Sequence, residues 1–496
     1  MGRLITTLII FPFLLAATPD TAKYRPDADD LLYFLIISDT HIDAPADSGK
    51  EATENLHWAT TTLVDTVLPN FLVNGGDLTD ATGGGLIPLG QQEMEWDSYQ
   101  SIVDGNGMSA DFYYDMPGNH DHYLDGALQH YVDHSVQGRH DGKTNHAWTS
   151  TNDQTKYHFI AVASAASDGL PFPEDNVGLD EVDLAFLEET LSLHNDADIL
   201  TVFSHHPAAY YEEAKSVIYD VLSDHGATAF IHGHTHGHSL TWQQGTFHFE
   251  IASLGKSDDD QVGLVAYDGR GMSAFAFALD QWPQVLITAP LDGKLGGSHQ
   301  YDYMIPDSLD AAPVRALAFH PEGIAAVAAT LDSGDQSFPL LKEGERLWQG
   351  NFDATKLASG PHKLLVTATA ADNTTASHQI TFYVIHDDDP VEPHIEIGPE
   401  VDADIVAAPP ESDYEVVSPD LAAPDEMSSP DTDTSISTEV AVADGPREVA
   451  PGPPGVTGYI KSGSDDGCTT GESRPAGAWL LGLLLLGLLV VRRRTA

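Results

Sequence analysis

Five short polar motifs, each placed directly after an apolar run, constrain the fold of this chain more than any other feature. Short apolar runs that are bounded by turn residues are typical of buried strands. Because open α/β sheets place their binding sites at the carboxyl ends of strands, we expect the motifs to meet at one site. In chain order they are Asp39-Thr40-His41, Gly76-Asp77-Leu78-Thr79-Asp80, Gly118-Asn119-His120-Asp121, His205-His206-Pro207 and Gly233-His234-Thr235-His236.

The motifs supply the atoms that hold metal ions in proteins. Carboxylate oxygens, an amide oxygen and imidazole nitrogens together suit a pair of divalent transition metals. One such motif is a weak signal, because Asp-x-His occurs by chance in many proteins. Five motifs in a fixed order, each behind a strand-like run, are a far more specific signal for a metal centre.

This ordered set of motifs resembles the calcineurin-like metallophosphoesterases, over roughly residues 31–280. The resemblance implies a two-sheet α/β sandwich that holds two divalent metal ions, either manganese, iron or zinc. It also implies an enzyme that hydrolyses phosphomonoesters or phosphodiesters by attack of a metal-activated hydroxide. The partner is then a small phosphate-ester substrate, whose identity the residues leave open.

The same resemblance assigns the metal ligands. Asp77 is implied to bridge the two ions, because a shared carboxylate holds them together and offsets their mutual repulsion. The other implied ligands are Asp39, His41 and His236 at one ion, and Asn119, His205 and His234 at the other.

Catalytic roles follow from the same motifs. His120 is implied to face the substrate and to stabilise or protonate the leaving oxygen, with Asp121 orienting its imidazole. Asp80 is expected to hydrogen-bond a metal ligand, and His206 to lie behind the ligands or face the substrate. We interpret the histidines that follow these motifs as exposed loop residues: His122, His130, His134, His140 and His146.

The spacing of apolar residues predicts two folded parts. Helical patterns alternate with apolar strands in residues 23–280, which favours an α/β domain. Residues 281–386 contain mainly short strand candidates, which are typical of an immunoglobulin-like β-sandwich. This order of domains resembles the transmembrane-protein-sixty-two type of the superfamily.

The chain is strongly acidic. Lys and Arg total 22 against 76 Asp and Glu, a formal net charge of −54, so no nucleic-acid partner is expected. Residues 387–475 are rich in Pro, Ser, Asp and Ala and poor in aromatic residues, which predicts a disordered acidic linker. Cys468 is the only cysteine, so no intrachain disulfide can support the fold.

Both termini carry targeting signals. Residues 1–22 have a basic start, a short apolar run and small residues, as a secretory signal peptide does. Residues 476–496 combine an apolar run that is short for a membrane span with three arginines, and resemble sorting tags of the myxobacterial type. A secreted protein at the cell surface is therefore expected, either processed by a sorting protease or held in the membrane by this segment.

Two other classes of function compete with the enzyme. One is a catalytically silent surface protein that uses the immunoglobulin-like domain for adhesion. The other is a metal-binding or structural stalk protein, which fits the acidic linker. The presence of every expected ligand in the five motifs favours the enzyme over both.

Overall fold

The computed structural model describes residues 31–43, 50–81, 90–152, 155–165, 178–211, 215–256, 260–295, 304–334 and 336–386. The predicted signal peptide, acidic linker and C-terminal apolar segment lie outside these residues. Among the helices in the described part of the chain, none is long and apolar enough to cross a membrane.

The first sheet of the α/β domain is mixed and has five strands. Strand β1 lies at its centre, parallel to β2 on one side and antiparallel to β10 on the other. Strand β3 continues the sheet beyond β2 in the parallel sense, and β11 continues it beyond β10 in the antiparallel sense. The strands are β11 (Gly271–Ala278), β10 (Gln261–Asp268), β1 (Leu31–Ile37), β2 (Leu72–Asn74) and β3 (Tyr113–Asp115).

The second sheet has six strands, of which the inner four run parallel. Its two edge strands, β4 and β8, run antiparallel to their neighbours. In spatial order the strands are β4 (His146–Thr151), β5 (Lys156–Val162), β6 (Ile199–Ser204), β7 (Ala229–His232), β9 (Thr246–Glu250) and β8 (Ser239–Gln243).

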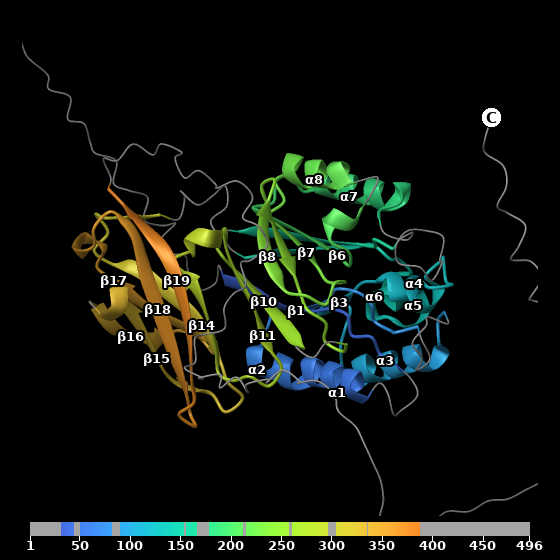
Figure 1. Cartoon of the computed structure of the whole chain (residues 1–496), viewed down its shortest axis with the longest axis horizontal. Helices are drawn as coiled ribbons and strands as arrows, with labels where there is room; N and C mark the ends of the chain where they lie inside the picture. The colour runs from blue at the N-terminus through green and yellow to red at the C-terminus, as the bar shows by residue number, and fades with distance from the viewer. Residues whose placement is uncertain are drawn as a thin grey trace, which may run out of the picture. The chain divides into compact units, whose positions relative to one another are not determined.

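The two sheets pack face to face, as Figure 1 shows, with helices outside them. In β1, Phe34 and Ile36 point into the core between the sheets, whereas Leu35 and Ile37 point toward the helices. The Phe34 ring lies 5.8 Å from that of Phe203 in the second sheet. A strand that is buried on both faces needs a continuous apolar run, which is what β1 has. The predicted α/β sandwich is therefore confirmed.

Helices cover the outer faces of the sandwich. The predicted helix at 51–68 is present as α1 (Lys50–Trp58), a π-helical turn (Ala59–Leu63) and α2 (Val64–Val67), and it ends where Leu68 is left-handed. Helix α3 (Glu93–Gly105) packs on the same face, and α7 (Glu181–Leu193) and α8 (Lys215–Asp224) cover the second sheet. The shorter helices α4 (Asn119–His122), α5 (Gln129–His134) and α6 (Val136–Asp141) follow β3.

Residues after 281 form a β-rich region with one curled eight-stranded sheet around its own apolar core. The second half of strand β18 alternates fully buried and partly buried side chains, as expected of a sheet with one more solvated face. The finer immunoglobulin-like assignment stays a prediction. In chain order the strands are β12 (Gln284–Ala289), β13 (Ile305–Pro306), β14 (Ala312–Phe319), β15 (Ile324–Leu331), β16 (Gln336–Lys342), β17 (Leu347–Phe352), β18 (Gly360–Ala370) and β19 (Thr375–Ile385).

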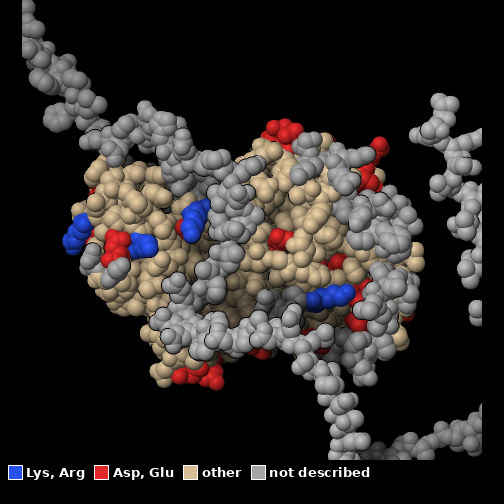
Figure 2. Space-filling view, in the orientation of Figure 1, with Lys and Arg blue, Asp and Glu red and all other residues tan. Residues whose placement is uncertain are grey.

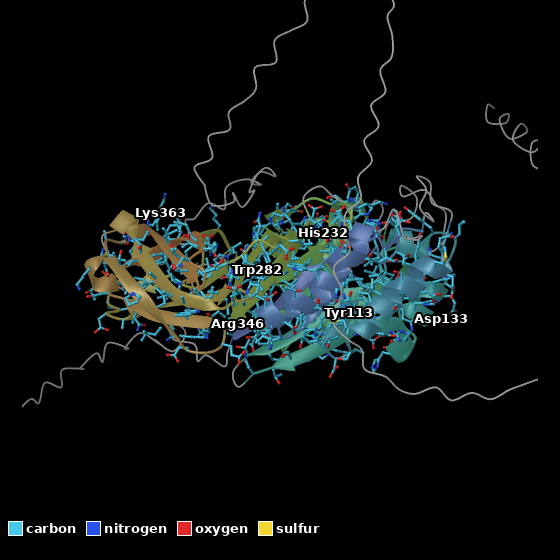
Figure 3. All side chains as sticks on the ribbon, turned by 90° about the horizontal axis from the view of Figure 1, so that it is seen from below. Tyr113, Asp133, His232, Trp282, Arg346 and Lys363 are labelled. Atoms are coloured by element: carbon cyan, nitrogen blue, oxygen red, sulfur yellow. The ribbon has the colours of Figure 1, made fainter. Side chains whose placement is uncertain are left out.

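The β-rich region contacts the α/β domain directly. Figure 3 labels Trp282 and Arg346 where the two parts meet. The Trp282 ring lies 6.4 Å from that of Trp58, and Arg346 Nε donates to the Thr66 carbonyl oxygen at 2.6 Å. On the face shown in Figure 2, the Lys and Arg side chains of the described residues form small separate spots among Asp and Glu, with no broad basic surface.

Candidate metal centre

The five motifs lie at adjoining strand ends. Asp39 follows β1, Asp77 follows β2 and Asn119 follows β3, all in the first sheet. His205 follows β6, and His234 follows β7, both in the second sheet. The carboxyl ends of these parallel strands meet along one edge of the sandwich, so the fold brings together residues as distant in the chain as Asp39 and His234, which are 195 residues apart.

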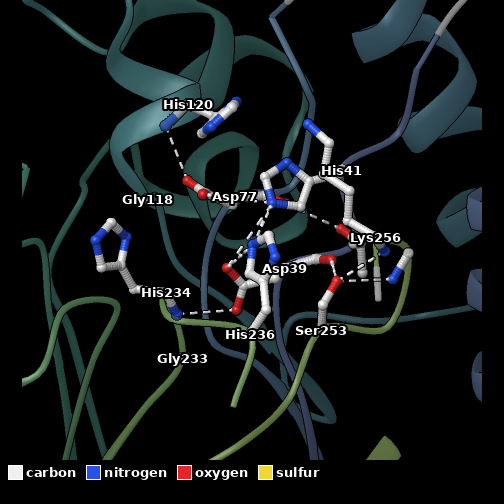
Figure 4. A network of polar contacts seen from close by, with 12 residues as sticks. Asp39, His41, Asp77, Gly118, His120, Gly233, His234, His236, Ser253 and Lys256 are labelled. Atoms are coloured by element: carbon white, nitrogen blue, oxygen red, sulfur yellow. Dashed lines mark hydrogen bonds and ion pairs between the residues drawn. The ribbon is translucent and has the colours of Figure 1, made fainter. Parts of the chain in front are cut away.

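One group of ligand-type atoms comes from Asp39, His41 and His236, which lie within 4.8 Å of one another (Figure 4). His236 Nε2 is 3.4 Å from Asp39 Oδ1 and 3.1 Å from His41 Nε2. The distance from His41 Nε2 to Asp39 Oδ1 is 3.8 Å. Three donor atoms therefore face one small volume.

A second group surrounds Asn119. The Asn119 Oδ1 atom is 3.2 Å from His205 Nε2 and 3.1 Å from His234 Nδ1. The Asn119 amide nitrogen donates to the Tyr123 hydroxyl at 2.7 Å, which leaves the oxygen turned toward the two imidazoles.

Asp77 lies between the two groups. Its Oδ2 is 3.7 Å from His41 Nε2 in the first group and 3.3 Å from His205 Nε2 in the second. Asp39, Asp77 and His205 also have ligand atoms within 4.8 Å of one another. This is the placement expected of a carboxylate that is shared by two cations.

The backbone holds these side chains in unusual conformations. Asp39, His41, Asp77, His234 and His236 all have positive φ values, between 43° and 76°. Non-glycine residues in this region carry strain, which persists where the surrounding structure fixes them and which gathers at functional sites. Five of the seven predicted ligands therefore occupy conformations that the rest of the fold must stabilise.

Each aspartate keeps one oxygen for the cavity and has the other fixed by a backbone amide. Asp39 Oδ2 accepts from the His234 amide at 3.0 Å, and Asp77 Oδ1 accepts from the His120 amide at 2.8 Å. By contrast, Asp39 Oδ1 is buried with no hydrogen-bond donor within the described part of the protein.

Further contacts orient the imidazoles. His205 Nδ1 donates to the Gly75 carbonyl oxygen at 2.9 Å, so its Nε2 keeps a lone pair for the cavity. His41 Nδ1 is 3.1 Å from Asp80 Oδ1, which fits the prediction that Asp80 supports a metal ligand. Contacts of this kind fix both the tautomer and the ring orientation of metal-binding histidines.

The electrostatics of the cavity favour positive charge. Burial alone would raise the pKa of Asp39, but the His205 and His236 imidazoles lower it to about 2. Burial would likewise lower the pKa of His205, yet the Asp77 and Asp39 carboxylates raise it to about 9. The pKa of Asp77 lies well below its ordinary value, because His205 and His120 outweigh burial. The buried carboxylates thus favour positive charge in the cavity, which a proton on His205 supplies here and which divalent cations would supply when bound.

The remaining ligand histidines differ in their surroundings. Burial lowers the pKa of His41 and of His234 to about 4, which keeps both imidazoles neutral and able to coordinate. The Asp39 carboxylate, whose Oδ1 is 3.4 Å from His236 Nε2, raises the pKa of His236. Carboxylate oxygens turned into the cavity, imidazole nitrogens and one amide oxygen fit a pair of divalent transition-metal cations.

His120 lies beside the first group. Its side chain is 17% exposed, and its Nδ1 donates to the Asp80 carbonyl oxygen at 2.7 Å. The His41 and His120 rings make an edge contact at 4.6 Å. His120 Nε2 is then the ring nitrogen that can face a bound substrate.

The role expected for Asp121 differs from its observed contacts. Its carboxylate accepts the backbone amides of Gly118 at 2.8 Å, Leu78 at 3.0 Å and Thr79 at 3.0 Å, and no contact with the His120 imidazole is among them. Asp121 therefore joins the loop after β3 to the loop after β2. Burial and the nearby Asp77 carboxylate raise its pKa to about 7.

Sequence reasoning missed two residues of the site. Lys256 forms an ion pair with Asp80, and Ser253 Oγ donates to the Asp39 carbonyl oxygen at 2.8 Å. Both follow β9, which runs parallel to β7, so its carboxyl end reaches the same edge. The apolar run before Ser253 was the available signal. His206 lies beside the second group: its Nδ1 is 2.8 Å from Ser164 Oγ, and it has a ligand atom within 4.8 Å of those of His205 and His234.

Comparisons with known proteins agree with this geometry. Residues 32–238 match the calcineurin-like phosphoesterase family. Transmembrane protein 62 of Mus musculus is 27% identical over 323 residues, which cover 62% of this chain and 48% of that protein. A metallophosphoesterase of Arabidopsis thaliana is 24% identical over 378 residues. The match covers 63% of this chain and 50% of the Arabidopsis protein. The chain thus spans about half the length of these relatives.

Solved structures that resemble this chain have lower sequence identity to it than these relatives do. GAP50, the anchor in the inner membrane complex of Plasmodium, is 13% identical with a TM-score of 0.36, and the match covers 51% of this chain and 85% of GAP50. The identification rests instead on the matched family and on the buried His and Asp clusters at the strand ends. Residues 32–238 therefore form a calcineurin-like phosphoesterase domain, of a family of metal-dependent phosphoesterases, and the chain is a distant homologue of transmembrane protein 62.

Proposed function

We propose that this chain hydrolyses phosphomonoesters or phosphodiesters at a dinuclear centre. The observation that carries the proposal is the position of Asp77 Oδ2, which faces His41 in one ligand group and His205 in the other. The proposed ligands are those that the motifs predict: Asp39, His41, Asp77, Asn119, His205, His234 and His236.

Two bound divalent cations would polarise the phosphoryl oxygens and would lower the pKa of a coordinated water. The protein's own residues provide the rest. The Asp39 and Asp77 carboxylates offset the cation charge inside a buried cavity. His205 is held by Gly75 so that its Nε2 points inward. His120 is held by the Asp80 carbonyl, so that its Nε2 can donate a proton to the leaving oxygen.

The direct test combines metal analysis with a substrate pair. The purified chain should contain two metal ions and should hydrolyse an aryl phosphomonoester, an aryl phosphodiester or both. Chelation should abolish turnover, and adding back manganese, iron or zinc in turn should identify the active metal. Full turnover in a chain from which all metal has been removed would contradict the proposal.

The cellular location is a separate proposal that rests on sequence alone. Residues 1–22 would direct export, and residues 476–496 would be removed as a sorting tag or kept as an anchor. Intact-mass analysis of surface material distinguishes these fates. A mature chain that lacks residues 476–496 supports the tag, whereas retention of these residues supports the anchor, and a cytoplasmic chain that retains residues 1–22 would contradict export.

A further inference from the structure

A second cluster of metal-ligand side chains lies between helices α3 and α5, away from the strand ends. Glu93 and Asp97 are four residues apart on α3, and His130 and His134 are four residues apart on α5. Residues four apart share one face of a helix. Ligand atoms of Glu93, Asp97 and His134 lie within 4.8 Å of one another.

Both histidines have one ring nitrogen already engaged. His130 Nδ1 donates to Asp125 Oδ2 at 2.7 Å, and His134 Nδ1 donates to Gln100 Oε1 at 3.0 Å. Each imidazole therefore carries its hydrogen on Nδ1 when it is neutral and has a lone pair on Nε2. A carboxylate or amide oxygen behind the histidine is the usual support of a metal-binding imidazole.

Both Nε2 atoms face the same carboxylate. His134 Nε2 is 3.5 Å from Glu93 Oε1, and His130 Nε2 is 3.9 Å from Glu93 Oε2. These separations are too long for good hydrogen bonds. Two atoms that are each about 2.0–2.2 Å from a tetrahedral zinc ion lie roughly 3.3–3.6 Å apart. The 3.5 Å between His134 and Glu93 falls in this range, whereas the 3.9 Å between His130 and Glu93 is longer.

The charge of the cluster also favours a cation. Glu93, Asp97 and Asp125 bring three carboxylates to two imidazoles, so neutral histidines leave the group strongly negative. The side chain of Glu93 is 66% exposed and that of His134 is 12% exposed, so an ion from solvent can reach a partly buried imidazole.

We infer that Glu93, Asp97 and His134 hold a zinc ion on the surface of the α/β domain, with His130 beside them. One imidazole nitrogen and two carboxylate oxygens, with water in the fourth position, are a ligand set that zinc accepts in tetrahedral geometry. Magnesium and calcium prefer all-oxygen ligands and should not bind here.

The site would join two segments beside the metal centre. Gln91, just before α3, donates to the carbonyl oxygens of His120 at 2.8 Å and Tyr123 at 3.1 Å. A zinc ion between α3 and α5 would therefore fix both ends of the loop that follows His120. This role is structural, because none of the three ligands contacts the metal centre in the contacts described above.

Metal counting on the full-length chain tests the inference. The wild type and a His130→Gln/His134→Gln double variant are dialysed against the same zinc buffer, and zinc per chain is measured by mass spectrometry. The wild type should hold one zinc ion more than the double variant. The difference tests this site alone, whatever the strand-end centre binds, so failure here is separate from failure of the proposed function.

Two further variants keep the result clear. Glu93→Gln changes an exposed side chain, so it should fold normally and still lose the additional zinc. His140→Gln removes an exposed histidine from α6 and should lose none. Zinc should also raise the melting temperature of the wild type more than that of Glu93→Gln. Equal zinc content in the wild type and the double variant, or an equal loss in His140→Gln, would overturn the site and leave an imidazole–carboxylate ion pair.

Discussion

Asp77 connects the two ligand groups through a single oxygen atom, while its other oxygen is fixed by the His120 amide. Asp77→Asn keeps the size of the side chain but removes the charge that offsets two cations. We expect this variant to lose both metal ions and nearly all turnover. Metal analysis and a steady-state assay check this, with Asp220→Asn on the exposed face of α8 as the matched control. Two metal ions per chain with a wild-type rate would show that Asp77 is no bridge.

His120 contributes to the site in a different way, because its Nδ1 is held by a carbonyl oxygen and only Nε2 can face a substrate. His120→Ala should keep near-full metal content while turnover falls by roughly 10²–10⁴-fold, the range typical of positioned acid–base groups. The loss should shrink for aryl esters with acidic leaving groups, because protonation then matters less. An alkyl and an aryl phosphate assayed side by side give the comparison. An equal loss on both esters would point to phosphate binding, and loss of a metal ion would make His120 a ligand.

Strand-to-loop junctions set how closely the motifs approach, and glycine permits that approach. A Cβ atom on Gly118 would lie 2.2 Å from Asp77 Oδ1 and 2.4 Å from the Asp77 backbone nitrogen. Because the second contact is with backbone, Gly118→Ala should displace the Asp77 loop, lower the free energy of unfolding by about 1–3 kcal/mol and weaken metal binding.

Gly105→Ala, at the end of α3, is the matched control for this effect. No atom lies within 4 Å of a Cβ placed on Gly105, so the variant should be neutral or slightly stabilising. Denaturant unfolding with parallel metal analysis checks both variants. If Gly118→Ala unfolds at the wild-type denaturant concentration and keeps its metal, the close contact between Gly118 and Asp77 does not affect stability or metal binding.

The elements that the sequence predicts well are those whose signal is local. Neighbouring residues alone predict the apolar run of β1 and the helix over 51–68. They also predict the N-terminal cap of α7, where Asp180 accepts from the Val182 and Asp183 amides. The order of the motifs likewise predicts which side chains meet, because parallel strand ends share an edge.

Contacts made between distant loops could not be predicted in this way. Asp121 lies beside His120 in the chain, yet its oxygens are used by Leu78 and Thr79, about forty residues away. The histidines after Asp121 were interpreted as exposed loop residues, which is wrong for several of them. His122 and His146 are buried, and His130 and His134 lie on a helix. His134 contacts Gln100 on α3 and His146 contacts Tyr131 on α5, and the residues next to these histidines do not predict either contact.

The α/β domain and the β-rich region share part of one core. Leu286, Leu317 and Phe319, from strands after residue 281, belong to the same apolar cluster as Phe277. The buried Arg315 Nε lies 3.2 Å from Asp268 Oδ2, and Thr288 Oγ1 donates to the same oxygen at 2.7 Å. The division proposed at residue 281 therefore separates two parts that stabilise each other, although every proposed metal ligand lies in the first.

The response of the whole protein to acid depends on histidines far from the metal centre. Burial lowers the pKa of His158 to about 4, helped by the neighbouring His194, and burial also lowers that of His146 to about 4. Their ordinary value is 6.5, so between pH 6.5 and 4 the unfolded chain binds more protons than the folded one. Stability contributed by the neutral imidazoles is complete above pH 6.5 and is lost as the pH falls toward 4, by at most about 1.4 kcal/mol per pH unit for each histidine.

The wild-type curve alone cannot isolate this effect, because protonating carboxylates on a chain with a net charge of −54 relieves repulsion over the same range. The difference between the wild type and His158→Gln, measured by denaturant unfolding with a chelator present, cancels that contribution. His158→Gln should flatten the loss of stability between pH 6.5 and 4, whereas the exposed His140→Gln should follow the wild type. Parallel curves for wild type and His158→Gln would mean that His158 takes up its proton without unfolding, and that its burial does not control the acid response.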